Sequence, residues 1–161
     1  MIHQQAHDHG ERSRTMKILV ISGPNLNMLG KRESKHYGSI TLEQINNNLK
    51  SLAKSLGASL SFFQSNLEGE IIDFLQNEAS RKADGILINP GALTHYGYSL
   101  RDALVDTNLP IVEVHLSNID NRESFRKVDV LDGIVSERIM GLKEKSYFIG
   151  LEKLVAHLKK T

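Results

Sequence analysis

The chain has 161 residues, with 20 basic and 19 acidic side chains and a formal net charge of +1. This length suits one domain, and so small a net charge gives no reason to expect binding to nucleic acid or to a membrane surface. The absence of cysteine excludes disulfides, thiolate nucleophiles and cysteine metal sites, and it fits a reducing cytoplasm. No apolar run reaches the roughly 20 residues that are needed to span a bilayer.

The first 15 residues are polar and lack the apolar core of a secretory signal. They include His3, His7 and His9, and a His-x-His pair can bind metal. Nothing in the neighbouring sequence would order such a site, so we expect a disordered extension over 1–15 and a single domain over 16–161.

The domain begins with a pattern of strand, loop and helix. A β-branched run at 17–22 predicts a buried strand, and a long polar loop follows over 23–40. Thr41 and Gln44 have the spacing of a capping box, so a helix is predicted to begin there and to end at Gly57. The apolar residues of this helix fall on one face: Leu42, Ile45, Leu49, Leu52, Ala53 and Leu56.

A second strand is predicted over 59–64, followed by a helix that Asn66 could cap. The apolar stripe of that helix is Ile71, Ile72, Leu75 and Ala79. A third strand is predicted over 85–88, and Pro90 ends it because proline biases Asn89 toward extended geometry.

The second half of the domain repeats the alternation. A helix is predicted near 97–106, and Pro110 introduces a fourth strand over 111–115. A fifth strand is predicted over 134–139 and a last helix over 147–159. The stripe of the last helix is Leu151, Leu154, Val155 and Leu158.

Five strands that alternate with helices predict an α/β fold with a parallel sheet, because parallel strands need crossover connections. We expect helices on both faces of the sheet and the flavodoxin-like strand order 2-1-3-4-5. The chain contains no internal repeat and no low-complexity linker, which also favours one domain.

In open α/β sheets, ligands bind beyond the carboxyl ends of the strands, near the switch in strand order. The segments to inspect are therefore those that follow the first, third and fourth strands. Their polar residues should face one crevice: Asn25, Asn89, His95, His115 and Ser117.

The loop after the first strand does not have a nucleotide-binding pattern. A P-loop has four residues between its glycines and a Ser or Thr after its lysine. Here six residues separate Gly23 from Gly30, and Arg32 follows the lysine. Arg32 and Tyr37 could be a solvated arginine and a packed tyrosine, or they could belong to a catalytic lid.

Several segments together resemble the type II 3-dehydroquinate dehydratases. The resemblance runs from about Lys17 to Arg126, in the family's order and spacing. The segments are GPNLNMLGKRE at 23–33, Tyr37-Gly38, Gln64-Ser65-Asn66 with Glu68-Gly69-Glu70, INPGALTH at 88–95, Arg101-Asp102-Ala103, EVHLSN at 113–118, Arg122-Glu123 and Phe125-Arg126.

The resemblance implies a cytoplasmic lyase of the shikimate pathway or of quinate breakdown that needs no cofactor and no metal. It also implies a dodecamer of four trimers, with no nucleic-acid or membrane partner. By resemblance, Tyr37 is the general base, Arg32 its electrostatic partner and His115 the general acid. Asn25 and Asn89 hold an ordered water or the substrate. The implied substrate-binding residues are Asn89, His95, Leu116, Ser117 and Arg126, together with Asp102, which would reach a neighbouring subunit's site.

The chemistry of the implied reaction fits these residue types. Loss of water from a β-hydroxy ketone needs a base beside the carbonyl group, a stabilised enolate and an acid for the departing hydroxyl group. Arg32 would favour the phenolate of Tyr37, and Glu113 is a possible orienting partner of His115. Arg126 can grip a carboxylate with two parallel hydrogen bonds.

The chain departs from the family's pattern after Arg126. Asp129 stands where the family commonly has serine, and the glycine-rich stretch at 141–147 keeps only its first glycine. Asp129 and Asp132 could pair with Arg126 or belong to subunit contacts. Two other classes remain open: a binding module without catalysis, and a hydrolase or nucleotide enzyme, although the sequence offers no Ser-His-acid set or phosphate loop for the latter.

Overall fold

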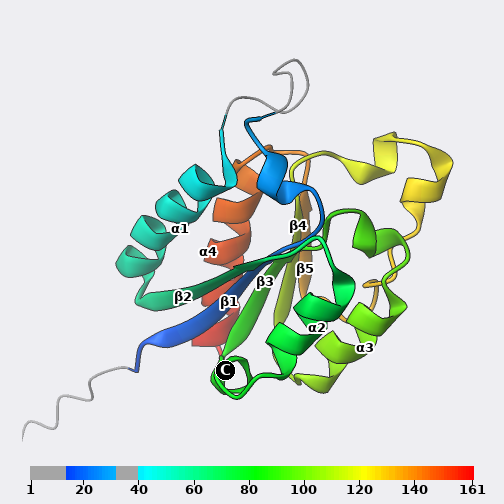
Figure 1. Ribbon diagram of the computed structural model, residues 1–161. Coiled ribbons are helices and arrows are strands. Elements are labelled where there is room, and N and C mark those ends of the chain that lie inside the picture. Colours follow the sequence, from blue (N-terminus) through cyan, green and yellow to red (C-terminus); the bar gives the residue numbers. More distant parts are fainter. Residues whose placement is uncertain (1–13, 32–39) are drawn as a thin grey trace, which may run out of the picture.

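The structure, a computed structural model, describes residues 14–31 and 40–161. Its centre is a five-stranded parallel sheet in the order β2-β1-β3-β4-β5, which confirms the predicted order (Figure 1). The strands are β1 (Met16–Ser22), β2 (Ala58–Gln64), β3 (Gly85–Asn89), β4 (Ile111–His115) and β5 (Glu137–Met140).

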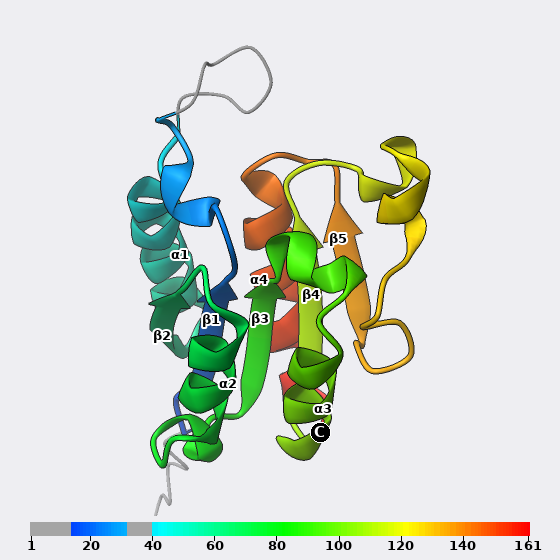
Figure 2. The same cartoon turned by 45° about the vertical axis from the view of Figure 1, so that its right-hand side comes forward.

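Helices cover both faces of the sheet, as predicted. The helices α1 (Leu42–Leu56) and α4 (Lys145–Lys159) lie on one face, and α2 (Glu68–Gln76) and α3 (Tyr98–Asp106) lie on the other (Figures 1 and 2). Each pair encloses an apolar cluster against the sheet. The β3 and β4 strands contribute to both clusters and are buried along their whole length, as central parallel strands usually are.

The amino end of α1 has the predicted capping box. The Thr41 side chain accepts a hydrogen bond from the Gln44 N–H, and the Gln44 side chain accepts one from the Thr41 N–H. Gly57 ends the helix with φ 75°, a left-handed conformation that costs glycine little. These two signals fix both ends of the helix from the sequence.

Helix α4 lies unusually close to the sheet at Gly150. A Cβ atom at this position would stand 2.5 Å from Val114 Cγ1 and 2.9 Å from Leu87 Cδ1. A larger residue would force these two side chains to shift, so glycine packs the helix directly behind the strand that ends in His115.

The prediction that Asn66 caps the second helix is wrong. The residue before α2 is Leu67, and it makes no side-chain cap. The Asn66 carboxamide oxygen instead accepts hydrogen bonds from the Asn25 N–H at 2.9 Å and from Gln64 Nε2 at 3.2 Å. The side chain therefore ties the loop after β1 to the loop after β2. Ala79 lies beyond the end of α2.

The fifth strand begins later than predicted, at Glu137 rather than at residue 134. Parallel pairing starts where Val112 meets Glu137, just after the Ser136 N–H donates to the Ile111 carbonyl oxygen at 2.8 Å, so Ile134 and Val135 precede the pairing. Ile134 and Val135 are partly buried against the apolar cluster beneath α2 and α3. Burial without strand pairing explains why an apolar run predicted too long a strand.

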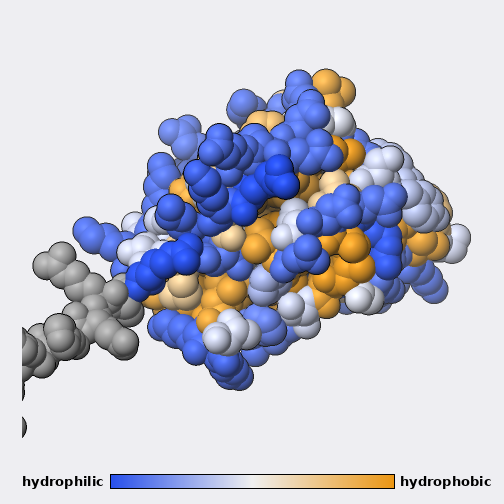
Figure 3. All heavy atoms as spheres, turned by 90° about the horizontal axis from the view of Figure 1, so that it is seen from below, coloured by the Kyte–Doolittle hydropathy of each residue, from blue (hydrophilic) through white to orange (hydrophobic). Residues whose placement is uncertain are grey.

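In the view from below, apolar side chains gather in the middle of the visible surface, between polar borders (Figure 3).

None of the helices in residues 14–31 and 40–161 combines the length and the apolar character that crossing a bilayer requires.

Candidate active site

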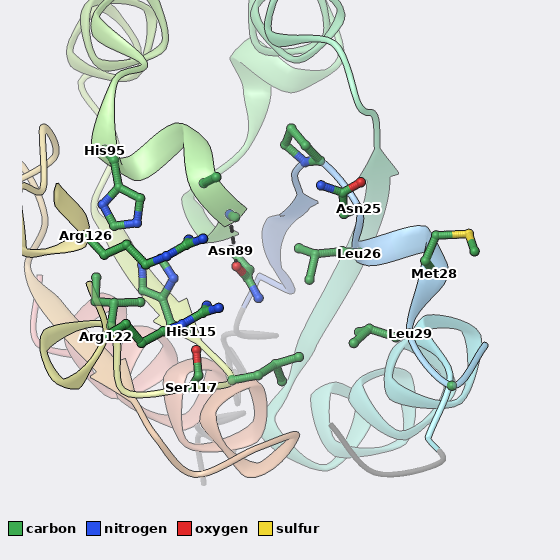
Figure 4. A pocket seen from close by; sticks show the side chains of 16 residues that line it. Asn25, Leu26, Met28, Leu29, Asn89, His95, His115, Ser117, Arg122 and Arg126 are labelled. Carbon is green, nitrogen blue, oxygen red and sulfur yellow. Dashed lines mark hydrogen bonds between the residues drawn. The ribbon is translucent and has the colours of Figure 1, made fainter. Parts of the chain in front are cut away.

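A pocket of about 220 Å³ lies at the carboxyl ends of β1, β3 and β4, where the strand order predicts a ligand site. Its walls come from the loops after these strands (Figure 4). Seven of the predicted site residues line it: Asn25, Asn89, His95, His115, Leu116, Ser117 and Arg126.

Of the other three predicted site residues, the structure describes only Asp102. Arg32 and Tyr37 lie outside the described residues. Asp102 is exposed on α3 and does not line the pocket. The roles of these three residues, including the reach of Asp102 into a neighbouring subunit, stay predictions.

The loops after β1 and β3 are in direct contact at the pocket's edge. The Gly23 N–H donates to the Asn89 carbonyl oxygen at 2.8 Å. A Cβ atom on Gly23 would lie 2.4 Å from the Pro90 carbonyl oxygen, so this approach requires glycine. Asn25 follows with φ 69°, a left-handed conformation that asparagine tolerates better than most residues.

Asn89 is a buried amide that ends β3 and faces the pocket. Its exposed fraction is 2%, and its carboxamide oxygen accepts a hydrogen bond from the Gly91 N–H at 3.1 Å. The side-chain nitrogen points toward the middle of the pocket (Figure 4). The amide therefore offers a fixed N–H donor to a water or substrate oxygen.

His95 is oriented by a backbone carbonyl group. Its Nδ1 atom lies 2.7 Å from the Val128 carbonyl oxygen, which can only accept, so Nδ1 carries the proton. In a neutral ring, the Nε2 atom is then an acceptor. A substrate hydroxyl group is the kind of donor that this atom can bind.

His115 stands above a buried carboxylate, Glu113. The His115 Nε2 and Glu113 Oε2 atoms are 3.2 Å apart, which is ion-pair distance, although the N–H is not aligned as a hydrogen-bond donor. The Thr94 hydroxyl group donates to the other Glu113 oxygen at 3.1 Å. Glu113 has no exposed surface, so its contacts fix it in place.

Glu113 keeps its charge despite its burial. Burial raises the pKa of Glu113, but its close contacts with His115 and Asp129 and the positive charge of Arg138 together outweigh burial and lower the pKa to about 2. An ionised carboxylate therefore lies beside the His115 imidazole, at the foot of the pocket.

Arg138, on β5, binds the same oxygen atom of this carboxylate as His115. Its Nε atom donates to Glu113 Oε2 at 2.6 Å, and its Nη2 atom lies 2.5 Å from Asp129 Oδ2. Nη2 also pairs with Asp132. Burial, followed by the hydrogen bond and the charge of Glu113, raises the pKa of Asp129 to about 7.

Of the two alternatives for Asp129 and Asp132, the structure does not show pairing with Arg126, and a role in subunit contacts stays a prediction. The Arg126 Nε atom donates to Glu123 at 2.7 Å instead, three residues earlier in the chain. Asp129 and Asp132 pair with Arg138, which the sequence did not single out.

Glu113, His115 and Asp129 also have the composition of a metal site, with ligand atoms within 4.8 Å of one another. The guanidinium group of Arg138 already binds the carboxylates of Glu113 and Asp129, so it supplies the positive charge that a metal ion would otherwise supply. The arrangement therefore fits an ion-pair network better than a metal centre.

Arg122, which belongs to the segments of the resemblance but was given no role, lines the pocket together with Arg126. The signal was available, because the two arginines are four residues apart and follow β4 closely. The pocket thus has two guanidinium groups. Such a pair suits an anionic substrate.

Comparison with known proteins agrees with this geometry. Residues 16–155 match the family model described as dehydroquinase class II. A 3-dehydroquinate dehydratase from Roseiflexus castenholzii is 54% identical over 140 residues, which cover 87% of this chain and 88% of the relative. A second 3-dehydroquinate dehydratase, from Prochlorococcus marinus, is 52% identical over 90% of this chain and 99% of its own length.

Solved structures show the same fold. The type II dehydroquinase from Butyrivibrio crossotus superposes with a TM-score of 0.81 at 44% identity, covering 86% of this chain and 97% of that one. The type II dehydroquinase from Propionibacterium acnes gives a TM-score of 0.82 at 35% identity, over 89% and 98% of the two chains. The pocket described above thus belongs to a protein of the class II dehydroquinase family.

Proposed function

We propose that the protein is a hydro-lyase that converts 3-dehydroquinate into 3-dehydroshikimate. The observation that carries the proposal is the pocket itself. It combines an imidazole above an ionised carboxylate, a buried amide donor and two guanidinium groups, on His115, Glu113, Asn89, Arg122 and Arg126. The reaction would serve the shikimate pathway, which leads to the aromatic amino acids, or quinate catabolism.

The proposed mechanism is an anti elimination through an enolate. Tyr37, with Arg32 favouring its phenolate form, removes the proton beside the substrate's carbonyl group. The side-chain amides of Asn25 and Asn89, or an ordered water that they hold, stabilise the enolate oxygen. His115 then gives its proton to the hydroxyl group as it leaves as water, and Glu113 offsets the charge of the imidazolium.

The substrate's carboxylate would bind Arg126. Because the Arg126 Nε atom already donates to Glu123, its two terminal nitrogens remain to form a bidentate pair. His95 and Ser117 would bind the ring hydroxyl groups, with the Leu116 backbone beside them. No step requires a metal, a nicotinamide or a lysine imine, so we propose catalysis without a cofactor.

We also propose that the chain works in the cytoplasm as a dodecamer that is built from four trimers. Support comes from large apolar side chains that are exposed on the described surface, including Leu67, Tyr98 and Phe125, each at 60% or more. Asp102, exposed on α3, would complete a neighbouring site. Light scattering after size-exclusion chromatography tests the assembly, and a monomer would contradict it.

The function is tested by mixing the purified protein with 3-dehydroquinate and following the ultraviolet absorption of the conjugated enone product. We expect turnover without added metal or cofactor and no inactivation by borohydride plus substrate, since no imine forms. Tyr37→Phe, Arg32→Ala and His115→Ala should each lower kcat by roughly 100-fold or more while the fold persists. Binding of 3-dehydroquinate without any turnover would sink the proposal and favour a binding module.

A further inference from the structure

One oxygen atom of Glu113 contacts two side chains, Arg138 and His115. Its Oε2 atom lies 2.6 Å from Arg138 Nε and 3.2 Å from His115 Nε2. Glu113 and Arg138 are also paired residues of the neighbouring strands β4 and β5, so the sheet itself holds them together. The charge that Glu113 offers to His115 is thus divided with Arg138.

Asp129 balances Arg138 from the opposite side. Its Oδ2 atom is 2.5 Å from Arg138 Nη2, and its Oδ1 atom accepts the Leu131 N–H at 2.8 Å. The side chain is 3% exposed. Asp129, Glu113 and His115 have side-chain atoms within 4.8 Å of one another, so the charge of Asp129 also acts on the imidazole directly.

We propose that Arg138 and Asp129 are positioning residues that set, through Glu113, the pH above which His115 loses the proton it needs for dehydration. The inference rests on the proposed function, in which His115 is the acid. Arg138 repels the imidazolium, while an ionised Asp129 attracts it, so removing them should have opposite effects. The described charged and titratable groups around the imidazole are Glu113 on β4, Asp129 and Asp132 before β5, Arg138 on β5, Arg122 and Arg126 after β4, and His95 after β3.

The test is the pH dependence of kcat/KM in the enone assay. The acid must be protonated, so its loss produces the high-pH limb of the profile. Asp129→Asn should move that limb to lower pH, and Arg138→Met should move it to higher pH. Each shift should be roughly half a unit to one unit, the usual effect of one nearby charge that is partly screened.

Two further variants separate the charge effect from structural damage. Arg138→Lys keeps the positive charge, so it should return the limb toward its wild-type position even if kcat falls. Asn at position 129 can still accept the Leu131 N–H, so that turn survives the substitution. Asp84→Asn is the matched control, because Asp84 also accepts a backbone N–H, from Lys17, but lies at the opposite end of the sheet.

A second measurement does not depend on turnover. Histidine-labelled protein, with the His115 signal assigned by its absence in His115→Ala, gives the titration of that imidazole directly by NMR. Its midpoint should shift in the same two opposite directions. Limbs and midpoints that stay at the wild-type pH in Asp129→Asn and Arg138→Met, or that move in the same direction, would overturn the inference. An inactive wild-type protein whose His115 signal still shifts would instead contradict the proposed function alone.

Discussion

Arg126 carries a specific expectation about substrate affinity. Its Nε atom is held by Glu123, so the guanidinium plane is fixed and its terminal nitrogens can form two parallel bonds to a carboxylate. Lysine keeps the charge but offers a single ammonium group. We expect Arg126→Lys to raise KM about tenfold or more, with a smaller change in kcat, in steady-state enone kinetics.

Glu123→Gln is the matched control for this prediction. Glutamine can still accept from Arg126 Nε, so the arginine stays oriented and KM should change much less. An unchanged KM in Arg126→Lys would mean that the carboxylate binds elsewhere, and Arg122 is then the residue to test next.

The sequence predicts a site residue when its position at the end of a strand is enough to bring it to the site. Asn89 and His115 are the last residues of β3 and β4, so parallel pairing brings them to one edge. Arg138 could not be found this way. Its contact with Glu113 depends on the register of β4 against β5, and the apolar run before Glu137 hid where that register begins.

Helix α4 is fitted to the sheet at Gly150, and a methyl group there should disturb the packing. Alanine favours helix by about 1 kcal/mol over glycine. Its Cβ atom would, however, stand 2.5 Å from Val114, on the central strand that ends in His115. We expect Gly150→Ala to lower the free energy of unfolding by about 1–2 kcal/mol despite the better propensity, measured by urea denaturation at fixed protein concentration.

Ala156→Gly is the control, at an exposed position of the same helix. It measures the difference in helix propensity between alanine and glycine without a change in packing. A loss of about 1 kcal/mol in that control, with no loss in Gly150→Ala, would show that the sheet can yield to the extra methyl group.

The turn between β5 and α4 contains a residue in an unfavourable conformation. Lys143 has φ 53°, a left-handed conformation that costs glycine less than lysine. The turn is otherwise satisfied, because the Leu142 N–H donates to the Ser146 hydroxyl group. We expect Lys143→Gly to raise the free energy of unfolding by roughly 0.5 kcal/mol. A lower thermal midpoint in a calorimetric scan would indicate instead that the lysine side chain makes a stabilising contact.

Elements could be predicted from the sequence when a local signal marks their ends. Thr41, Gln44 and Gly57 fix both ends of α1, because each makes its contact within a few residues. The start of α2 was predicted from Asn66, but its side chain bonds the Asn25 N–H, 41 residues away. The Asn66 side chain thus bonds a distant backbone group in place of the first turn of α2. The sequence of the helix contains no pattern that predicts this contact.

At the scale of the whole molecule, the strand order does most to create the site. Because β1, β3 and β4 are neighbours, loops distant in the chain meet above one edge of the sheet. The edge strand β5 then contributes Arg138 from beneath. Moving the fifth strand by one residue would turn this side chain to the other face, so the network depends on the register of the sheet.

The buried carboxyls also make the stability of the fold depend on pH in two opposite ways. Glu113 ordinarily has a pKa of 4.5, and the fold lowers it to about 2, so its stabilisation is present above pH 4.5 and is lost as the pH falls below that. Asp129 ordinarily has a pKa of 3.8, and the fold raises it to about 7, so the fold loses stability as the pH rises between these values. Urea midpoints of the wild-type protein should therefore decline from about pH 4 to pH 7 through Asp129.

Asparagine cannot ionise, so Asp129→Asn should remove the decline between about pH 4 and pH 7 and leave the acid loss through Glu113 in place. The gap between the two curves should grow steadily across that range, with a total of the order of 1 kcal/mol or more. Urea titrations at intervals of about one pH unit give both curves. If they run parallel, Arg138 compensates fully for the charge of Asp129, and its burial carries no net cost above pH 7.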